Sequence, residues 1–190
     1  MFVTRSTLQD FLTRLDAAYG RPGRVLLVGQ TSLVYEGHAP WTDEAELTAE
    51  VEDPVAFDAA LRRAAEAAGI AVWPESPADV IPLPEGYEDR HRAADAAGLQ
   101  HLRLAHFDPY SVAYRFIARG DEPDYHLVLA YLDQGWVTFA EMDARLDALL
   151  PRFSMETIAQ DPAEFMRRYK GLRQMAAAIA PGTLHRHTPA

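Results

Sequence analysis

Two groups of polar residues in the first quarter of the chain have the types and spacing that phosphate and metal binding require. Gly29 is followed by the polar segment Gln30–Ser32, and backbone N–H groups at the start of a helix, with hydroxyls beside them, suit a phosphate. Glu44 and Glu46 are two residues apart, so on a strand both carboxylates project from one face. Carboxylates paired in this way hold Mg²⁺ against the phosphates of a nucleotide.

Each group also has a structural interpretation. Thr31 or Ser32 can simply cap a helix. Glu44 and Glu46 can belong to a solvated strand face that Glu50 continues. Taken separately, both groups favour the structural interpretation, so the predicted chemistry depends on the fold bringing them together.

Other polar residues are weaker candidates. Asp79 is expected on the following strand, where it is either a third carboxylate or a turn residue that opens the strand. The segment Arg90–Arg92 is a short basic cluster that could meet phosphates or form a solvated loop. Asp108 is most simply a helix N-cap, because a proline follows it. His185 and His187 are too few for a specific metal site.

The composition is that of an ordinary globular protein. The chain has 190 residues, of which 48% are hydrophobic and 24% are charged. This length favours one domain with a sizeable core. The absence of cysteine excludes disulfides and thiolate chemistry. We expect a cytoplasmic protein of bacterial type, because no apolar run approaches the ~20 residues of a membrane span and the N-terminus lacks the layout of a signal peptide.

The net charge of −10 opposes long-range attraction to nucleic acid. The charge therefore disfavours a large nucleic-acid-binding surface, and we expect RNA to be bound only through a local basic patch. The basic residues available for such a patch are Arg90, Arg92, Arg167, Arg168 and Lys170.

Periodicity predicts alternating helices and strands in the first half of the chain. The first helix is expected to begin at Ser6 as its N-cap, and a later helix has Asp53 as cap, Pro54 at its first position and Gly69 at its end. The predicted elements are a helix over 5–20, a strand over 24–29, a short helix over 31–37, a strand over 44–51 and a helix over 53–70.

The second half is predicted to be mostly helical. Short extended pieces at 71–73 and 79–84, a loop at 86–98 and a strand at 99–107 lead to helices over 108–120, 124–135, 138–153 and 161–179. This order predicts an α+β fold with a small mixed sheet flanked by helices and a helical C-terminal half. We expect a single domain over 1–190, with a sheet-containing core at 5–107, a helical extension at 108–180 and a frayed tail at 181–190.

Four segments in order give the chain a family resemblance. The segments "VLLVGQTSLVYEG", "WTDEAEL", "DVIPLPEGYEDR" and "HFDPYSVAYRFIARGDEPDYHLV" together resemble the minimal nucleotidyltransferase-like proteins of bacteria, which include the AbiEii/MenT-type toxins of toxin–antitoxin systems. The resemblance covers roughly residues 5–180, and its most specific part is the block that runs from "PLPEGYEDR" to "DPY".

The chain departs from the family pattern where chemistry would occur. Gln30 stands where the family has a second glycine, and its Cβ occupies space that a phosphate would approach. Glu44 and Glu46 stand in place of two aspartates and are one methylene longer. Arg115 lies at or next to the position of the family lysine, and the two cations are not equivalent.

The resemblance implies transfer of a nucleoside monophosphate from an NTP to a hydroxyl of RNA or protein, if the site is active. Gly29 and Gln30–Ser32 would then hold the triphosphate with Arg115, Glu44 and Glu46 would bind Mg²⁺, and Asp79 would be general base or third ligand. Two alternatives stay open. One is a degenerate relative that binds a nucleotide or a partner protein, which the combined departures favour. The other is a non-catalytic structural or interaction module on an α/β scaffold.

Overall fold

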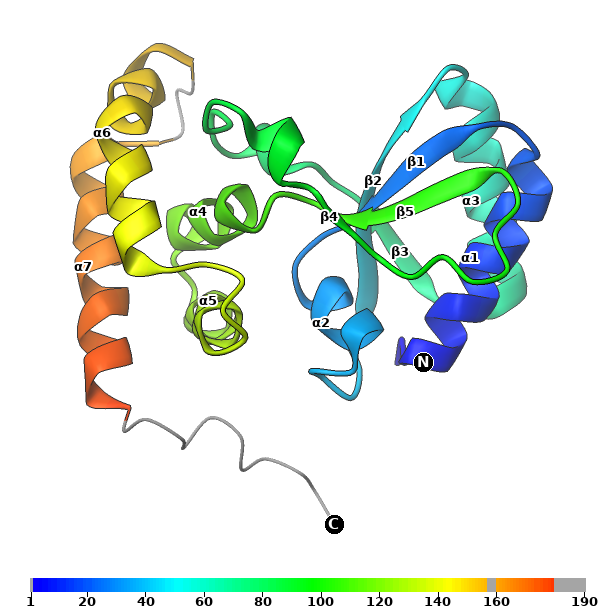
Figure 1. Ribbon diagram of the computed structural model, residues 1–190, viewed down its shortest axis with the longest axis horizontal. Coiled ribbons are helices and arrows are strands. Elements are labelled where there is room, and N and C mark those ends of the chain that lie inside the picture. Colours follow the sequence, from blue (N-terminus) through cyan, green and yellow to red (C-terminus); the bar gives the residue numbers. More distant parts are fainter. Residues whose placement is uncertain (1, 157–159, 180–190) are drawn as a thin grey trace. The chain divides into compact units, whose positions relative to one another are not determined.

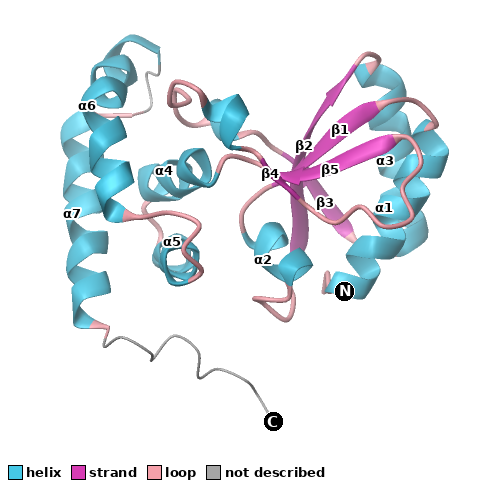
Figure 2. Cartoon of the chain, in the orientation of Figure 1, coloured by secondary structure: helices cyan, strands magenta, loops and turns pink. Residues whose placement is uncertain are grey.

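The chain folds as an α+β protein, as its sequence predicts (Figures 1 and 2). This computed structural model describes residues 2–156 and 160–179. The chain forms two compact units. The first consists of Met1–Ser76 and Arg90–Phe107, and the second of Pro77–Asp89 and Asp108–Ala190. The predicted boundary near residue 107 therefore coincides with a junction between units, but the segment 77–89 belongs with the helices.

The first unit is built on a five-stranded mixed sheet in the order β3-β2-β1-β5-β4. The central strand β1 is antiparallel to β2 and parallel to β5. Consequently the C-terminal ends of β1 and β5 lie at the same end of the sheet as the N-terminal end of β2, which we call the Glu44 end. The strands are β1 (Gly23–Leu27), β2 (Glu44–Val51), β3 (Ala71–Pro74), β4 (Arg92–Ala93) and β5 (Leu102–His106).

One face of this sheet forms the core of the first unit. The helices α1 (Arg5–Tyr19) and α3 (Pro54–Ala68) contribute apolar side chains that cluster with those of β1, β2 and β5. The alternation predicted for β2 is confirmed, because Ala45 and Leu47 belong to this core and Glu44 and Glu46 do not. Side chains of the core include Leu8, Phe11, Leu15, Val25, Leu27, Leu47, Phe57, Leu61, Leu102 and Leu104.

Helix caps agree with the sequence in one case and differ in another. Asp53 caps α3 by accepting from the Ala56 N–H at 3.0 Å, as predicted. The prediction that Ser6 caps α1 is wrong. Thr4 is the N-cap, because its side chain accepts from the backbone N–H of Thr7 while the Thr7 hydroxyl bonds back to Thr4. This reciprocal pair satisfies two helix-end donors, which Ser6 alone does not.

A buried carboxylate anchors the opposite end of the sheet, which we call the Asp16 end. Asp16 of α1 is 4% exposed, and it accepts from the backbone N–H groups of Gln100, His101 and Leu102 at 2.7–2.9 Å. Burial raises the pKa of Asp16, but these three bonds outweigh burial and leave the pKa below its usual value. Asp16 thus fixes the entry of the chain into β5.

The second unit is helical. Its core is aromatic, with the rings of Phe153 and Phe165 4.9 Å apart and the Tyr114 hydroxyl donating to the Met142 carbonyl at 2.7 Å. In the described ranges, no helix of either unit has the length and hydropathy that a membrane crossing needs. The main helices are α4 (Pro109–Arg119), α5 (Glu122–Asp133), α6 (Phe139–Glu156) and α7 (Pro162–Ala178).

The segment between β3 and β5 differs most from its prediction. Residues 79–84 are not extended. A short 3₁₀ helix, Pro77–Asp79, is followed by irregular chain, because prolines at 77, 82 and 84 remove the N–H groups that a strand needs. The loop expected at 86–98 contains a second 3₁₀ helix, Tyr87–Arg90, and the strand β4. The predicted tail at 181–190, with its two histidines, lies outside the described residues.

Candidate functional site

The turn between β1 and the short helix α2 (Gln30–Glu36) depends on glycine. Gly29 has φ 60° and ψ −132°, a conformation that residues with a Cβ rarely adopt. The chain therefore leaves β1 and enters α2 within one residue, which brings the next three side chains back over the end of the sheet. Thr31 and Ser32, the predicted phosphate ligands, are both buried.

Two of the polar side chains in this turn are already engaged by the protein. The Thr31 hydroxyl accepts from the Glu46 N–H at 2.8 Å, and the Gln30 amide donates to the Trp41 carbonyl at 2.9 Å. The buried Ser32 hydroxyl has no hydrogen-bond partner among the described residues. Contacts within the protein thus fix the conformation of the turn. The Ser32 hydroxyl remains without a hydrogen bond to the described residues.

The fold brings the predicted carboxylate pair beside this turn. The Val28 N–H donates to the Glu46 carbonyl at 3.0 Å, and the Thr31 bond ties α2 to the same residue. Glu44 and Glu46 are both half-buried on the sheet face opposite α1 and α3. The glycine turn and the carboxylates therefore share the Glu44 end of the sheet, as the sequence hypothesis requires.

The remaining predicted site residues belong to the second unit. Asp79 ends a 3₁₀ helix and not a strand, which corrects the expected placement. Arg115 lies in α4, is fully buried and has its guanidinium 5.2 Å from the Phe116 ring centre. Because Glu44 and Glu46 belong to the first unit, neither unit alone contains all the predicted site residues.

A buried histidine–carboxylate pair at the Glu44 end was not predicted from the sequence. His106, at the end of β5, is 3% exposed, and its Nε2 lies 2.7 Å from Oε1 of Glu36 at the end of α2. Burial lowers the pKa of His106 below its usual value, and Glu36 offsets only part of that effect. The one signal in the sequence was a histidine that continues the apolar alternation of Leu102 and Leu104.

The His106–Glu36 pair is not part of the same cluster as Glu44 and Glu46. His106 is opposite Leu27 in the sheet register, so it shares the face that α1 and α3 cover, whereas Glu46 projects from the other face. The hydroxyl of Tyr35, whose ring centre is 6.3 Å from that of His106, donates to the Asp95 carbonyl. These contacts make the pair a link between α2 and β5.

The two glutamates are the candidate donors for a metal. No group of three or more histidine, aspartate or glutamate side chains in the described ranges is arranged to hold a metal ion. Mg²⁺ commonly uses one or two carboxylates and completes its shell with water and substrate phosphates. Glu44 and Glu46 are thus a donor set that fits Mg²⁺ bound together with a nucleotide.

The proposed basic patch is divided between the units. Arg90 and Arg92 belong to the first unit, and the other three residues to the second. In α7, Arg167 and Arg168 both form ion pairs with Glu164, which reduces the positive charge available to RNA phosphates.

Comparisons of the chain with protein-family models, with curated proteins and with solved structures give no match.

Proposed function

We propose that the protein is nucleotidyltransferase-like, with a degenerate site at the Glu44 end of its sheet that binds a nucleotide or a partner protein. The observation that carries the proposal is the direct bond from the Glu46 N–H to the Thr31 hydroxyl. It links the glycine turn to the carboxylate strand, the two parts that such a site must place together to hold phosphates against a cation.

The degenerate form is favoured by what the turn residues already do. The Gln30 amide is bonded to the Trp41 carbonyl, so releasing it to a phosphate would break an existing contact. Its Cβ also limits how closely a phosphate can approach the backbone. Glutamates in place of aspartates shift the carboxylates by about the length of one bond, and a misplacement of ~1 Å can reduce a reaction rate on the order of 10²-fold.

A second candidate is an active, Mg²⁺-dependent nucleotidyltransferase of the toxin type. It is favoured by Glu44, whose carboxylate forms no hydrogen bond or ion pair with the described residues, so it is available to a cation. In this candidate Glu44 and Glu46 hold Mg²⁺, which would neutralise phosphate charge during transfer to an RNA or protein hydroxyl. Asp79 and Arg115 belong to the second unit, and Arg115 is fully buried, so this candidate rests on Glu44 and Glu46.

Nucleotide binding is tested by thermal unfolding of the full chain with ATP, CTP, GTP and UTP, each with and without Mg²⁺ or Mn²⁺. A nucleotide at 100 times its dissociation constant should add about 2.7 kcal/mol to the free energy of unfolding. A shift that needs the divalent cation supports the role of the two glutamates. If no nucleotide shifts the thermal unfolding of the protein, both nucleotide-dependent candidates are ruled out. The alternative that remains is an interaction module without nucleotide chemistry.

Two variants locate the binding. The double change Glu44→Gln and Glu46→Gln should abolish the cation-dependent part of the shift, whereas Glu50→Gln on the same strand face should not, because Glu50 pairs with Arg24 at 2.6 Å. Gln30→Gly restores the glycine of the family pattern and should strengthen nucleotide binding. Transfer of label from an NTP to RNA or to the protein then separates the active candidate from the degenerate one.

A further inference from the structure

A cleft in the second unit lies between the segment that carries "PLPEGYEDR" and helix α6. Its volume is about 230 Å³, the space of about seven or eight water molecules at ~30 Å³ each. All of its lining belongs to the second unit. It is lined by Pro84, Glu85, Ala144, Arg145, Ala148, Leu149 and Arg152.

Helical spacing explains why two arginines face this cleft. Arg145 and Arg152 are seven residues apart, which is two turns of α6 and places them on one side of the helix. Ala148 lies between them and leaves room that a longer side chain would fill. The two guanidinium groups therefore border a small space with an alanine floor.

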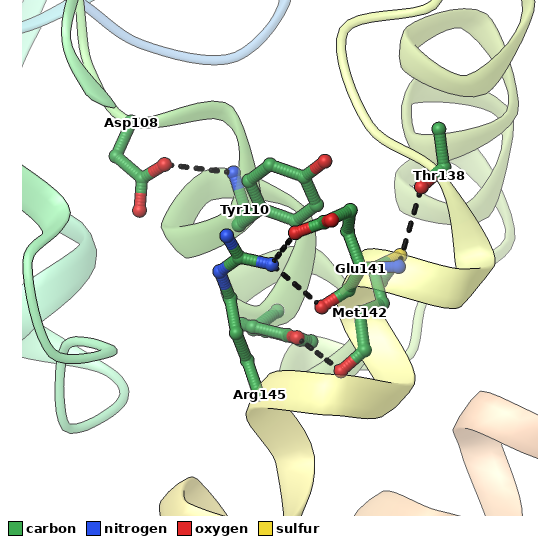
Figure 3. Close-up of polar contacts among 7 residues, drawn as sticks. Asp108, Tyr110, Thr138, Glu141, Met142 and Arg145 are labelled. Atoms are coloured by element: carbon green, nitrogen blue, oxygen red, sulfur yellow. Dashed lines mark hydrogen bonds and ion pairs between the residues drawn. The ribbon is translucent and has the colours of Figure 1, made fainter.

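Arg145 is held in place while part of its guanidinium stays available. Its Nη1 donates to the Glu141 carbonyl at 2.8 Å and also contacts the Glu141 carboxylate (Figure 3). Its carbon centre lies 4.5 Å from the ring centre of Tyr110. Among the described residues, no hydrogen bond uses its Nε or Nη2. A cation stacked on a ring with two spare donors is pre-ordered to bind an oxyanion.

Arg152 ties the other wall of the cleft to the helix. Its Nη1 donates to the Leu83 carbonyl at 2.7 Å, which fixes the proline-rich segment against α6. Glu85 lies on the same wall, and Glu141 holds Arg145, so two carboxylates oppose the two arginines. A ligand must therefore gain its affinity from geometry and not from excess positive charge.

We propose that this cleft binds the oxyanion group of a small molecule, either a phosphate or a carboxylate. The Nε and Nη2 of Arg145 supply the forked pair of donors that both anions accept. The space is smaller than the roughly 300–1,000 Å³ of pockets that enclose a drug-sized ligand, so the anionic group is enclosed and the rest of the ligand projects outward. This site is separate from the nucleotide turn of the first unit.

The test is a calorimetric titration of the full chain with inorganic phosphate and, separately, with acetate, at constant ionic strength. Saturable heat with one probe and not the other identifies which oxyanion the cleft accepts. Arg145→Gln should weaken that binding at least tenfold. Arg14→Gln is the matched control, since Arg14 forms the same i, i+4 ion pair with Asp10 on α1, and it should leave binding unchanged.

A second variant keeps the test decisive if Arg145→Gln does not fold. Ala148 is an exposed helix position on the cleft floor, so Ala148→Glu should fold and should abolish binding by placing a carboxylate in the anion's position. The proposal is overturned by an absence of saturable binding of either probe, by equal weakening in Arg14→Gln, or by full binding in Ala148→Glu. None of these results bears on NTP binding, so the two proposals fail separately.

Discussion

The two ends of the sheet use acidic residues in opposite ways. At the Asp16 end, one buried carboxylate accepts three backbone N–H groups and holds the entry to β5. At the Glu44 end, two half-buried carboxylates project from one strand face, and that of Glu44 forms no hydrogen bond or ion pair with the described residues. A carboxylate whose acceptor sites are filled by the backbone stabilises the fold, whereas one that the fold leaves open is available to a ligand.

The same contrast explains why the Glu44 end is the candidate site. Glu44 and Glu46 carry like charges on one strand face, and the Glu44 carboxylate forms no contact with the described residues that would offset their repulsion. The buried Ser32 hydroxyl in the nearby turn adds hydrogen-bonding capacity that no described residue uses. If stability and ligand binding are separated in this way, substitution should reduce stability most at Asp16 and least at Glu44 and Glu46.

The largest effect is expected at Asp16. Asp16→Asn removes the charge and presents an amide N–H₂ to backbone donors, so it should lower the free energy of unfolding by about 3 kcal/mol, the scale of lost charge-assisted hydrogen bonds. Urea unfolding at pH 7 measures the loss. Asp10→Asn is the control on the same helix, because Asp10 makes an exposed ion pair with Arg14 that should contribute less than about 1 kcal/mol. Equal losses would remove the special role of Asp16.

Acid should weaken the Asp16 end through the same carboxylate. The folded-state pKa of Asp16 is below its usual value, so its contribution is present above the unfolded pKa of about 3.9 and is lost as the pH falls through the folded pKa. Each unit of difference corresponds to about 1.4 kcal/mol. The free energy of unfolding should therefore fall below about pH 4, and less steeply in Asp16→Asn. Parallel pH curves would contradict this assignment.

Sequence patterns predict the elements of this fold better than its polar contacts. Asp53 with Pro54, and the alternation along Glu44–Val51, predict α3 and β2 because caps and periodicity are local. The Asp16 contacts span more than 80 positions, so no local pattern indicates them. Asp79 is misplaced because proline removes strand donors, an effect that the apolar pattern of its segment concealed.

The same difference between local patterns and long-range contacts applies to the candidate site. Spacing alone placed Glu44 and Glu46 on one face, and the glycine turn was expected because a strand ends there. Their proximity to the turn comes from the antiparallel pairing of β1 with β2, and in the sequence only the family resemblance assigned the turn and the carboxylates to one site. The bond between His106 and Glu36 joins residues 70 positions apart and was missed, since a histidine in an apolar alternation is indistinguishable from a core residue.

The next largest effect is expected at the glycine turn. Gly29→Ala forces a Cβ into a backbone conformation with φ 60° and ψ −132°, which should cost about 1–3 kcal/mol. Gly171→Ala is the control, because that glycine lies within α7 with no atom near the added Cβ, and alanine there should add up to about 1 kcal/mol. Thermal unfolding of both variants should show a loss of stability for Gly29→Ala and a gain for Gly171→Ala. A Gly29→Ala protein as stable as the original would show that the turn carries no strain.

Acid should affect the Glu44 end at a higher pH than the Asp16 end. The pKa of His106 is lowered by burial and partly restored by Glu36, so its contribution is present above about pH 6.5 and is lost as the pH falls through the folded pKa. Glu36→Gln removes the restoring charge and lowers that pKa further. The variant should lose about 1 kcal/mol relative to the original protein as the pH falls from 8 to 5, measured by urea unfolding. A constant difference would mean that Glu36 does not act on His106 through charge.

Substitution of Glu44 and Glu46 should have the smallest effect on stability and the largest effect on ligand binding. Glu44 and Glu46 side chains lie about 7 Å apart along the strand, where two unit charges repel by roughly 0.6 kcal/mol in water. Changing both to glutamine should therefore alter the free energy of unfolding by less than about 0.5 kcal/mol. Any change should be a gain, largest at low salt, because salt screens the repulsion that the substitution removes.

Urea unfolding of the double variant at low and high salt measures this, with Glu50→Gln as the control that breaks the pair with Arg24. A loss above about 1 kcal/mol would class Glu44 and Glu46 with Asp16 as structural carboxylates and break the comparison. A small gain in the free energy of unfolding that disappears at high salt would show that the charges of Glu44 and Glu46 destabilise the fold slightly. That is the outcome expected of carboxylates that do not anchor the fold and can serve a bound cation.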